Sequence, residues 1–402
     1  MSKLPVIEGD RGATPPVREL CALLGAHGCW FNPDLLIRLR EGQIGLFSRH
    51  PHQDRRSYIR LPLSLMPCQD DFHFSLSNGG LGCQPLTDRA TAPQQQIMQA
   101  VVALYNANSK LEWWGQTFPL LALEDHPELL TAICQAKTHN PKLNKYLALA
   151  AQGEREKLLV ESFLGSRVFR LTGEQRRRAG LDERKQSEDL VTLPVIDLFN
   201  HRIAAEPYVI NHQPPPSSMR VFARPDPESG ELFVRYNLYD AVDTYLFYGF
   251  VDSTAPWLGS IPMVLEAGGR VRYQVLNTGA ASPGKLPKNL QDLRLLMPNI
   301  SRRKGVACLS RLLIPGPAAP RSLQRILAHL VRRQLSEVGQ NELLTLVAAL
   351  EEQLIEANLQ WWRHLSKKVG TLAEEHPLAQ LCRQSTAHIE RYRKERPAIE
   401  RR

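Results

Sequence analysis

The sequence lacks the features that would place it in several common classes of protein. No run of apolar residues approaches the roughly 18 that a transmembrane helix needs, and charge and glycine interrupt the first ten residues, unlike a secretory signal. The seven cysteines are scattered and contain no C-x-x-C pair. These absences favour a reducing compartment and predict a cytoplasmic protein with no membrane partner.

Several signatures of enzymes and metal proteins are also missing. The sequence contains no Gly-x-Ser-x-Gly segment of the hydrolase type, no set of protein-kinase motifs, and no glycine-rich loop with the Lys-Ser/Thr of a P-loop. Because no zinc-type cluster of ligands is present, the sequence predicts no metal site.

The composition is that of a folded, soluble protein. With 402 residues and 43% apolar residues, the chain can bury substantial cores, and its length suggests two or three domains. Charged residues make up 23%, so nothing in the composition indicates wholesale disorder.

The formal net charge of +9 favours acidic partners, although a solvated basic face is the simpler interpretation. Nucleic acid is a possible partner but not a favoured one, because the positive charge is spread widely and no helix interleaves basic and aromatic residues.

The order of sequence patterns predicts a mixed α+β protein with a helical appendage. Residues 21–65 mix short apolar pieces with turn residues, as short strands do, and residues 92–171 repeat apolar positions at helical spacing. A charged connector at 173–188 is expected to be a surface loop. Residues 219–224 and 231–236 alternate in period two around a turn-rich segment, which predicts a hairpin.

The last third of the chain predicts a boundary followed by helices. A second hairpin is expected between residues 263–266 and 270–273, and residues 276–320, rich in Pro, Gly, Asn and Ser, indicate a linker. The basic tail from residue 388 onward is expected to be frayed or solvated. Two apolar stripes at helical spacing lie between the linker and the tail. Their residues are Leu323, Ile326, Leu327, Leu330, Val331 and Leu335, and then Leu343, Leu344, Val347, Leu350, Leu354 and Leu359.

Two short motifs stand out. Asp197, Asn200 and His201 close an apolar run, and 47 residues beyond His201 the chain reads Tyr-Gly-Phe at 248–250. Taken alone, Asp197 and Asn200 are expected to cap a loop, because short polar side chains often bond nearby backbone. The distant Tyr-Gly-Phe motif at 248–250 instead favours a functional role for these residues.

Together the motifs resemble the two halves of the active site in SET-domain lysine methyltransferases, in the branch of the Rubisco large-subunit methyltransferase. The resemblance implies that Asn200 and His201 line the site of the cofactor S-adenosylmethionine, and that Tyr248 faces the methyl group and the lysine amine. Segment 162–171 resembles the family's helix ending in Ser-Arg, so Arg167 corresponds to the arginine that contacts the cofactor. Its planar fork can pair with a carboxylate, whereas an ordinary surface charge is the alternative.

The amino-terminal cofactor loop of the family reads Gly-x-Gly followed by a hydrophobic residue, so that backbone can approach the cofactor closely. Here Gly45 and Leu46 match the end of that pattern, whereas Gln43 stands at the first glycine position and Ala241 replaces an asparagine of the family. The cofactor-binding residues that the resemblance implies are Gly45, Leu46, Arg167, Asp197, Asn200, His201 and Phe250.

Tyr248 is the predicted catalytic residue. The methyl group of a sulfonium is already electrophilic, so the protein must align the lysine amine with it. The amine must also be neutral, and because its ordinary pKa is near ~10.4, desolvation in an apolar channel has to lower it. Tyr236 and Phe250 are candidates to wall such a channel, whereas core packing is favoured for Tyr245 and Phe247.

The resemblance implies a protein-lysine methyltransferase that acts on a protein substrate presenting a lysine. It implies a leader and first part of the SET domain at 1–91, a helical insert at 92–190, a second part with the motifs at 191–275, and a linker and helical substrate-docking domain at 276–402. The alternative is a catalytically degenerate SET-fold module that binds an acidic protein or nucleic acid, which Gln43 and Ala241 would favour.

Overall fold

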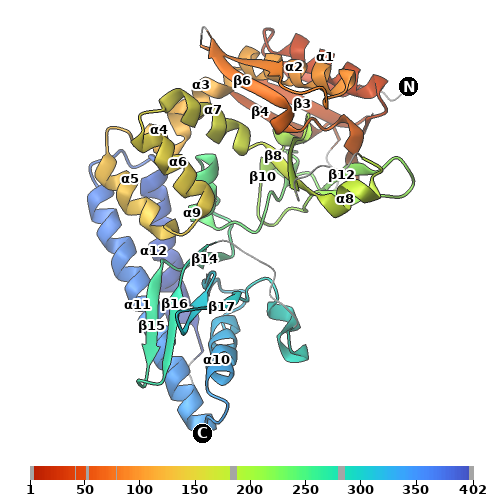
Figure 1. The fold of residues 1–402 in the computed structure, drawn as a ribbon. Helices are drawn as coiled ribbons and strands as arrows, with labels where there is room; N and C mark the ends of the chain where they lie inside the picture. The colour runs from red at the N-terminus through yellow and green to blue at the C-terminus, as the bar shows by residue number, and fades with distance from the viewer. Residues whose placement is uncertain are drawn as a thin grey trace. The chain divides into compact units, whose positions relative to one another are not determined.

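The computed structural model describes residues 4–40, 42–50, 54–77, 79–181, 188–278 and 286–397. The chain forms two compact units, and Figure 1 traces it from red at the N-terminus to blue at the C-terminus. The first unit contains Met1–Thr117 and Glu154–Leu238, and the second contains Phe118–Gly153 and Tyr239–Arg402. Residues 92–190 therefore contribute to both units, and the four-segment division into domains stays a prediction.

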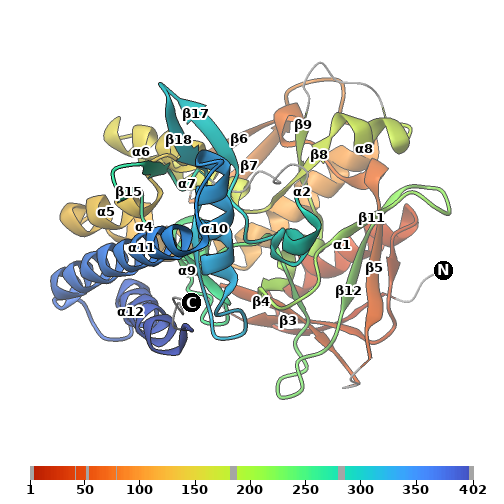
Figure 2. The same ribbon diagram turned by 90° about the horizontal axis from the view of Figure 1, so that it is seen from below.

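Small sheets form the framework of the first unit. One sheet has the order β1 (Val6–Gly9), β3 (Leu35–Arg40), β4 (Gln43–Ser48), with β1 parallel to β3. A four-stranded antiparallel sheet has the order β11 (Val209–Asn211), β12 (Ser218–Ala223), β5 (Arg56–Pro62), β2 (Trp30–Phe31). The long strands β5 and β12 run side by side (Figure 2). The pairs β6–β7, β8–β9 and β10–β13 complete the strands described in this unit: β6 (Phe72–Ser77), β7 (Gly80–Pro85), β8 (Val168–Thr172), β9 (Glu188–Thr192), β10 (Asn200–His201) and β13 (Phe233–Val234).

Helices with well-defined starts pack on these strands. Thr91 forms a capping box with Gln94 at the start of α2, so two backbone N–H groups that the helix leaves unpaired find partners. The helices of the first unit are α1 (Thr14–Ala26), α2 (Ala92–Ala107), α3 (Lys110–Thr117), α7 (Arg155–Gly165) and α8 (Gly173–Arg178). Proline in the first turn of α1 and α2 suits these starts, because proline has no N–H to satisfy there.

The second unit is mainly helical. In it α10 (Ser322–Gln334) and α12 (Pro377–Glu395) pack on the long helix α11 (Gln340–Val369), and buried Leu346, Leu350 and Leu354 follow the helical period. Its shorter helices are α4 (Pro119–Ala122), α5 (Pro127–Cys134), α6 (Pro141–Ala151) and α9 (Ala241–Tyr248). The same unit contains a four-stranded sheet and a separate pair of strands. The sheet has the order β15 (Met263–Ala267), β16 (Val271–Val275), β18 (Val306–Leu309), β17 (Ile300–Arg303), and the pair is β14 (Trp257–Gly259) with β19 (Leu313–Pro315).

The mixed α+β class with a helical C-terminal end is therefore confirmed. The hairpin around Gly268 and Gly269 is present as β15 and β16, and both apolar stripes lie on helices, α10 and α11. Residues 92–171 are mostly helical, as the spacing predicts, until β8 begins at Val168.

The predicted hairpin of residues 219–236 is wrong. Pro225 and Leu232 form a single bridge around the turn, but β12 pairs with β5 on one side and β11 on the other. Because both edges of β12 are occupied, the following segment has no edge to join. Phe233 and Val234 pair instead with β10, in parallel.

Four other local predictions need correction. The linker predicted at 276–320 contains β17, β18 and β19, with Lys304 and Gly305 at positive φ in the turn between β17 and β18. The tail predicted to fray is helical through Glu395, because Ile389 and Tyr392 are buried on one face of α12; residues 398–402 lie outside the described part. The connector is helical at 173–178, and 182–187 lie outside the described residues. Residues 21–26, expected among the strands, end α1.

Candidate active site

Arg167 and Asp197 form a buried ion pair in the first unit. Arg167 follows the last turn of α7, and Asp197 lies in a single 3-10 turn at Ile196–Leu198. The Arg167 Nη1 donates to the Asp197 carboxylate at 3.3 Å and to its backbone oxygen at 3.4 Å. Their side chains are 11% and 3% exposed, so the pair is held away from bulk water.

Aromatic rings enclose this pair. The Tyr105 hydroxyl, on α2, donates a short hydrogen bond to the Asp197 carboxylate. The Arg167 guanidinium carbon lies 4.7 Å from the ring centre of Phe163 and 5.3 Å from that of Tyr105, within the range of cation–π attraction. Tyr105 was not among the residues predicted for the site, because nothing in its helical pattern distinguishes it from a core aromatic.

Burial changes the protonation of the cluster. Burial raises the pKa of Asp197, while Arg167 acts in the opposite direction. Lys110, the first residue of α3, is only 8% exposed, and its pKa is lowered to about 7 by burial and by the positive charge of Arg167. Lys110 therefore loses its proton near neutral pH, which spares the site a second buried positive charge.

A strained turn brings Asp197 to its partners. Val195 has φ of 66°, which a β-branched side chain rarely adopts and which costs on the order of 1–3 kcal/mol. The Asp197 N–H donates to the Leu193 oxygen at 2.9 Å, and the Leu198 N–H donates to Val195 at 3.1 Å. The chain therefore turns sharply here, instead of continuing as the buried strand that its apolar run suggests.

Asn200 and His201 form β10, directly after this turn. Asn200 is exposed, and its Nδ2 donates to the Glu231 carboxylate at 2.6 Å. His201 is buried, and its Nδ1 accepts the backbone N–H of Tyr236 at 3.1 Å. The Tyr236 hydroxyl donates to the Phe199 oxygen, which fixes that ring beside the imidazole.

Gly45 and Leu46 lie in the regular strand β4, and the predicted glycine loop is absent from these residues. Gly42, at φ of +64°, occupies the turn that joins β3 to β4, where a side chain would also meet Trp113. A Cβ on Gly45 would lie 2.9 Å from the Phe47 ring, so glycine is needed there for packing. The oxygen of buried Leu46 accepts from the Leu232 N–H at 2.7 Å.

Residues 231–236 connect these pieces. Glu231 bonds Asn200, Leu232 bonds β4, and β13 pairs with β10. The first unit thus gathers five predicted cofactor residues near one short segment, and Arg167 joins them through Asp197. They are Gly45, Leu46, Asp197, Asn200 and His201.

Tyr248 and Phe250 belong to the second unit. Tyr248 is the last residue of α9, and Gly249, at φ of 75°, ends the helix in the left-handed conformation. The Tyr248 and Tyr239 hydroxyls are 3.4 Å apart, and the Phe250 ring lies 6.3 Å from that of Tyr248. Tyr245 and Phe247 are buried in α9, in line with the core packing favoured for them.

A buried charge cluster at the other end of α9 was not predicted from the sequence. Lys137 Nζ lies 2.8 Å from the Asp243 carboxylate and 3.4 Å from that of Asp240, which caps α9. Burial and the charge of Asp240 raise the pKa of Asp243 to about 6. Burial opposes ionisation of Asp240 as well, but Lys137 and hydrogen bonds lower its pKa. The spacing Asp240-x-x-Asp243 indicates a helix cap, and nothing in the sequence points to Lys137.

Within the part of the chain that the structure describes, no group of three or more His, Cys, Asp or Glu residues could hold a metal ion. No helix among the described residues is both long enough and apolar enough to cross a membrane.

No family model and no curated protein matches this chain. Among solved structures, it is similar over 95% of its length to the SET domain of LSMT bound to lysine and AdoHcy, with 11% identity, a TM-score of 0.40 and 92% of that chain covered. It is similar over 95% to Rubisco LSMT bound to AdoMet, with 14% identity, a TM-score of 0.41 and 92% covered.

Proposed function

We propose that this protein is a methyltransferase that uses S-adenosylmethionine to methylate a lysine side chain of a protein substrate. The observation that carries the proposal is the gathering, in the first unit, of β4 and the Asp197-x-x-Asn200-His201 turn around residues 231–236. β4 lies more than 100 residues from this turn in the sequence, yet both contact residues 231–236. The turn supplies a carboxylate, an amide and a histidine, and Arg167 adds a guanidinium through its ion pair with Asp197.

The groups in this locality fit the cofactor in kind. The Arg167 Nε is buried and has no hydrogen-bond partner among the described residues, so it can donate to the cofactor's carboxylate. The exposed amide of Asn200 and the half-buried carboxylate of Glu231 are suited to the hydroxyl and ammonium groups of the same molecule. Aromatic rings beside Arg167 exclude water and strengthen these interactions.

When bound, the cofactor would supply an electrophilic methyl group to a neutral lysine amine, with the thioether AdoHcy as the leaving group and the methylated ammonium releasing its proton to solvent. Tyr248 is assigned the role of orienting that amine through its hydroxyl. The ring of Phe250 is assigned to the apolar surroundings that keep the amine neutral. The protein substrate, in this proposal, presents the lysine from an exposed segment.

Isothermal titration of the full-length protein with S-adenosylmethionine tests the cofactor assignment. Asn200→Ala should weaken binding about tenfold, because it removes a hydrogen-bonding group and releases Glu231. Asn237→Ala is a matched control, since Asn237 is also exposed and only bonds its own local backbone. Equal affinities for the two variants would contradict the role of Asn200.

Transfer of labelled methyl groups to proteins of a cell lysate tests the catalytic assignment. Tyr248→Phe should lower the rate about 100-fold, because misplacing a reacting group has an effect of this size. Tyr245→Phe, a buried tyrosine on the same helix, is the control and should keep its rate. Unchanged transfer by Tyr248→Phe would remove the assigned role, and the labelled proteins would identify the substrate.

A degenerate binding module is the second candidate. Two observations favour it: Asp197 already occupies Arg167, and Gln43–Ser48 form a regular strand in place of a glycine loop. This candidate predicts a folded protein that shows no heat of binding with millimolar S-adenosylmethionine. Saturable binding of the cofactor would exclude it in favour of the enzyme.

A further inference from the structure

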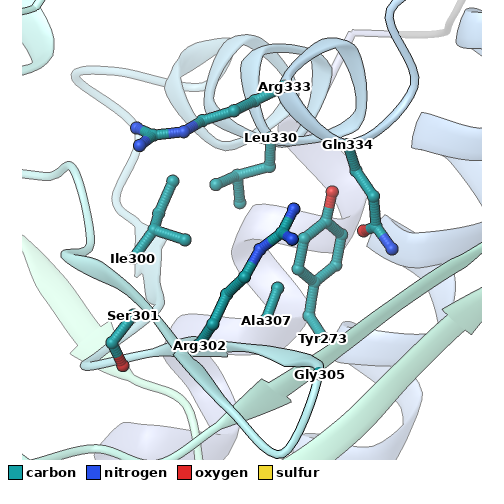
Figure 3. Close-up of a pocket in the computed structure, with 9 residues that line it drawn as sticks. All are labelled: Tyr273, Ile300, Ser301, Arg302, Gly305, Ala307, Leu330, Arg333 and Gln334. Carbon is teal, nitrogen blue, oxygen red and sulfur yellow. The ribbon is translucent and has the colours of Figure 1, made fainter.

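A pocket of about 300 Å³ lies in the second unit, apart from every residue assigned above. Figure 3 shows its walls: strands β16, β17 and β18 on one side and the last turns of α10 on the other. This volume is at the lower end of the range for small-molecule sites, which is roughly 300–1,000 Å³. The apolar part of the lining consists of Ile300, Ala307 and Leu330.

Two buried polar atoms at this pocket have no partner among the described residues. They are the hydroxyl oxygen of Tyr273, whose side chain is 2% exposed, and the Oε1 of Gln334. Figure 3 shows the Tyr273 hydroxyl pointing towards α10, between the side chains of Arg302 and Gln334. Leaving such atoms unpaired is unfavourable, because each loses its hydrogen bond to water without gaining another, so they are expected to meet a ligand or water.

Two guanidinium groups give the pocket its charge. Arg302 extends from β17 towards α10, and Arg333 extends from α10 on the side of Ile300 (Figure 3). Neither forms an ion pair within the described residues, although exposed arginines elsewhere in this unit do, such as Arg325 with Asp292. Among the described residues, no carboxylate lines the pocket, so its electrostatic complement is an anion.

The hydrogen-bonding groups narrow the choice of anion. The Tyr273 hydroxyl can donate and the Gln334 Oε1 can accept, and a single ligand hydroxyl can satisfy both. Burial raises the pKa of Tyr273, so its hydroxyl keeps its proton at neutral pH. The side chain of Ser301 points away in Figure 3 and adds nothing to this set.

We propose that this pocket binds a small organic anion that carries a hydroxyl group. Its carboxylate or phosphate lies between Arg302 and Arg333, its hydroxyl bonds Tyr273 and Gln334, and its carbon skeleton packs on Ile300, Ala307 and Leu330. This proposal is independent of methyl transfer, because no residue of the pocket belongs to the candidate active site.

Ligand-observed NMR with the full-length protein tests the site. The probes are 4-hydroxybenzoate, 4-hydroxyphenyl phosphate and the neutral 4-hydroxybenzamide. The proposal expects one or both anions to bind with at least tenfold higher affinity than the neutral probe, and their ratio identifies the preferred headgroup. Failure of both anions to bind at millimolar concentration would overturn it, as would equal binding of the neutral probe.

Variants locate the binding. Arg302→Gln should weaken binding of the anion about tenfold, whereas Arg303→Gln, the adjacent exposed arginine outside the pocket, should leave it unchanged. Tyr273→Phe keeps the buried ring and should weaken binding by about threefold to tenfold. Equal losses for Arg302→Gln and Arg303→Gln would mean non-specific attraction to a basic surface and would refute the proposal.

Discussion

Among single residues, Lys110 stands out as a buried amine beside a buried guanidinium. Its pKa is lowered from an ordinary 10.5 to about 7, chiefly by burial. The unfolded state therefore binds more protons than the folded state between pH 7 and 10.5, so the free energy of unfolding rises with pH across that window. Below pH 7 Lys110 is protonated in the folded protein as well, and the whole unfavourable effect of its buried charge then lowers the free energy of unfolding.

Lys110→Met should therefore stabilise the protein at pH 7 and remove this part of its pH dependence. In urea unfolding, the difference in the free energy of unfolding between variant and wild type should shrink by up to about 1.4 kcal/mol per pH unit above pH 7. The exposed Lys304→Met serves as the control. A difference that stays constant from pH 7 to 10 would contradict the lowered pKa.

The residues of the candidate site show how far sequence reasoning reaches at this scale. The resemblance predicts Asn200, His201 and Arg167 as cofactor residues, and in the first unit Arg167 pairs with Asp197, three residues before Asn200. Tyr105 was not found, because 92 residues separate it from Asp197 and only folding brings their oxygens together. The ion pair between Arg167 and Asp197 was not predicted, for the same reason.

At the scale of elements, α9 is held at both ends by specific local chemistry. Asp240 caps its start, where it accepts the N–H groups of Asp243 and Gly259 at 2.8 and 2.7 Å. Gly249 ends it at φ of 75°, a conformation that other residues adopt at a cost of about 1–2 kcal/mol. Tyr248, next to this glycine, depends on that ending for its position.

Gly249→Ala should lower the free energy of unfolding by about 1–2 kcal/mol. It should also reduce methyl transfer beyond what the lost stability explains, because the end of α9 moves. Gly339→Ala offers a control, since Gly339 directly precedes α11 at φ of −65° and a Cβ added there would meet no atom within 4 Å. Thermal melts measure the loss of stability. Rates measured well below both melting temperatures show whether methyl transfer falls further than this loss explains, and an unchanged rate would contradict the expectation.

The two hairpin predictions explain why one element can be predicted and another cannot. At Gly268 and Gly269 the turn and both strands are consecutive, so local pattern was sufficient. At residues 219–236 the turn also forms, with Gly230 at φ of 73°. The strand partners there were decided by β5, which lies far away in the sequence, and by β11, which precedes β12 and occupies its other edge.

At the scale of the whole molecule, the chain passes between its two units three times. Residues 118–153 belong to the second unit but are inserted within the first. The flanking helices α3 and α7 pack together in the first unit, where the Trp114 Nε1 donates to the Ser162 hydroxyl at 2.9 Å. The packing of α3 against α7 therefore does not depend on residues 118–153.

A chain of residues 1–117 and 154–238 joined by a flexible linker of about eight residues should fold cooperatively. Residues 1–238 with the insertion intact should aggregate, because Leu129 and Ile133, buried on α5, would be exposed when α5 loses its packing against α11. Size-exclusion chromatography and urea unfolding distinguish the two. A linked chain without a cooperative transition would show that the first unit is not an independent folding unit.

The sequence by itself determined features that depend on neighbours in the chain: the helices of the C-terminal region, the hairpin at 263–273, and the motifs that suggested methyl transfer. Tertiary structure alone decided which charges meet, as Lys137 does with Asp240 at a separation of 103 residues. Periodicity and turn chemistry act over a few residues, whereas the strength of an ion pair depends on burial, which only the folded chain creates.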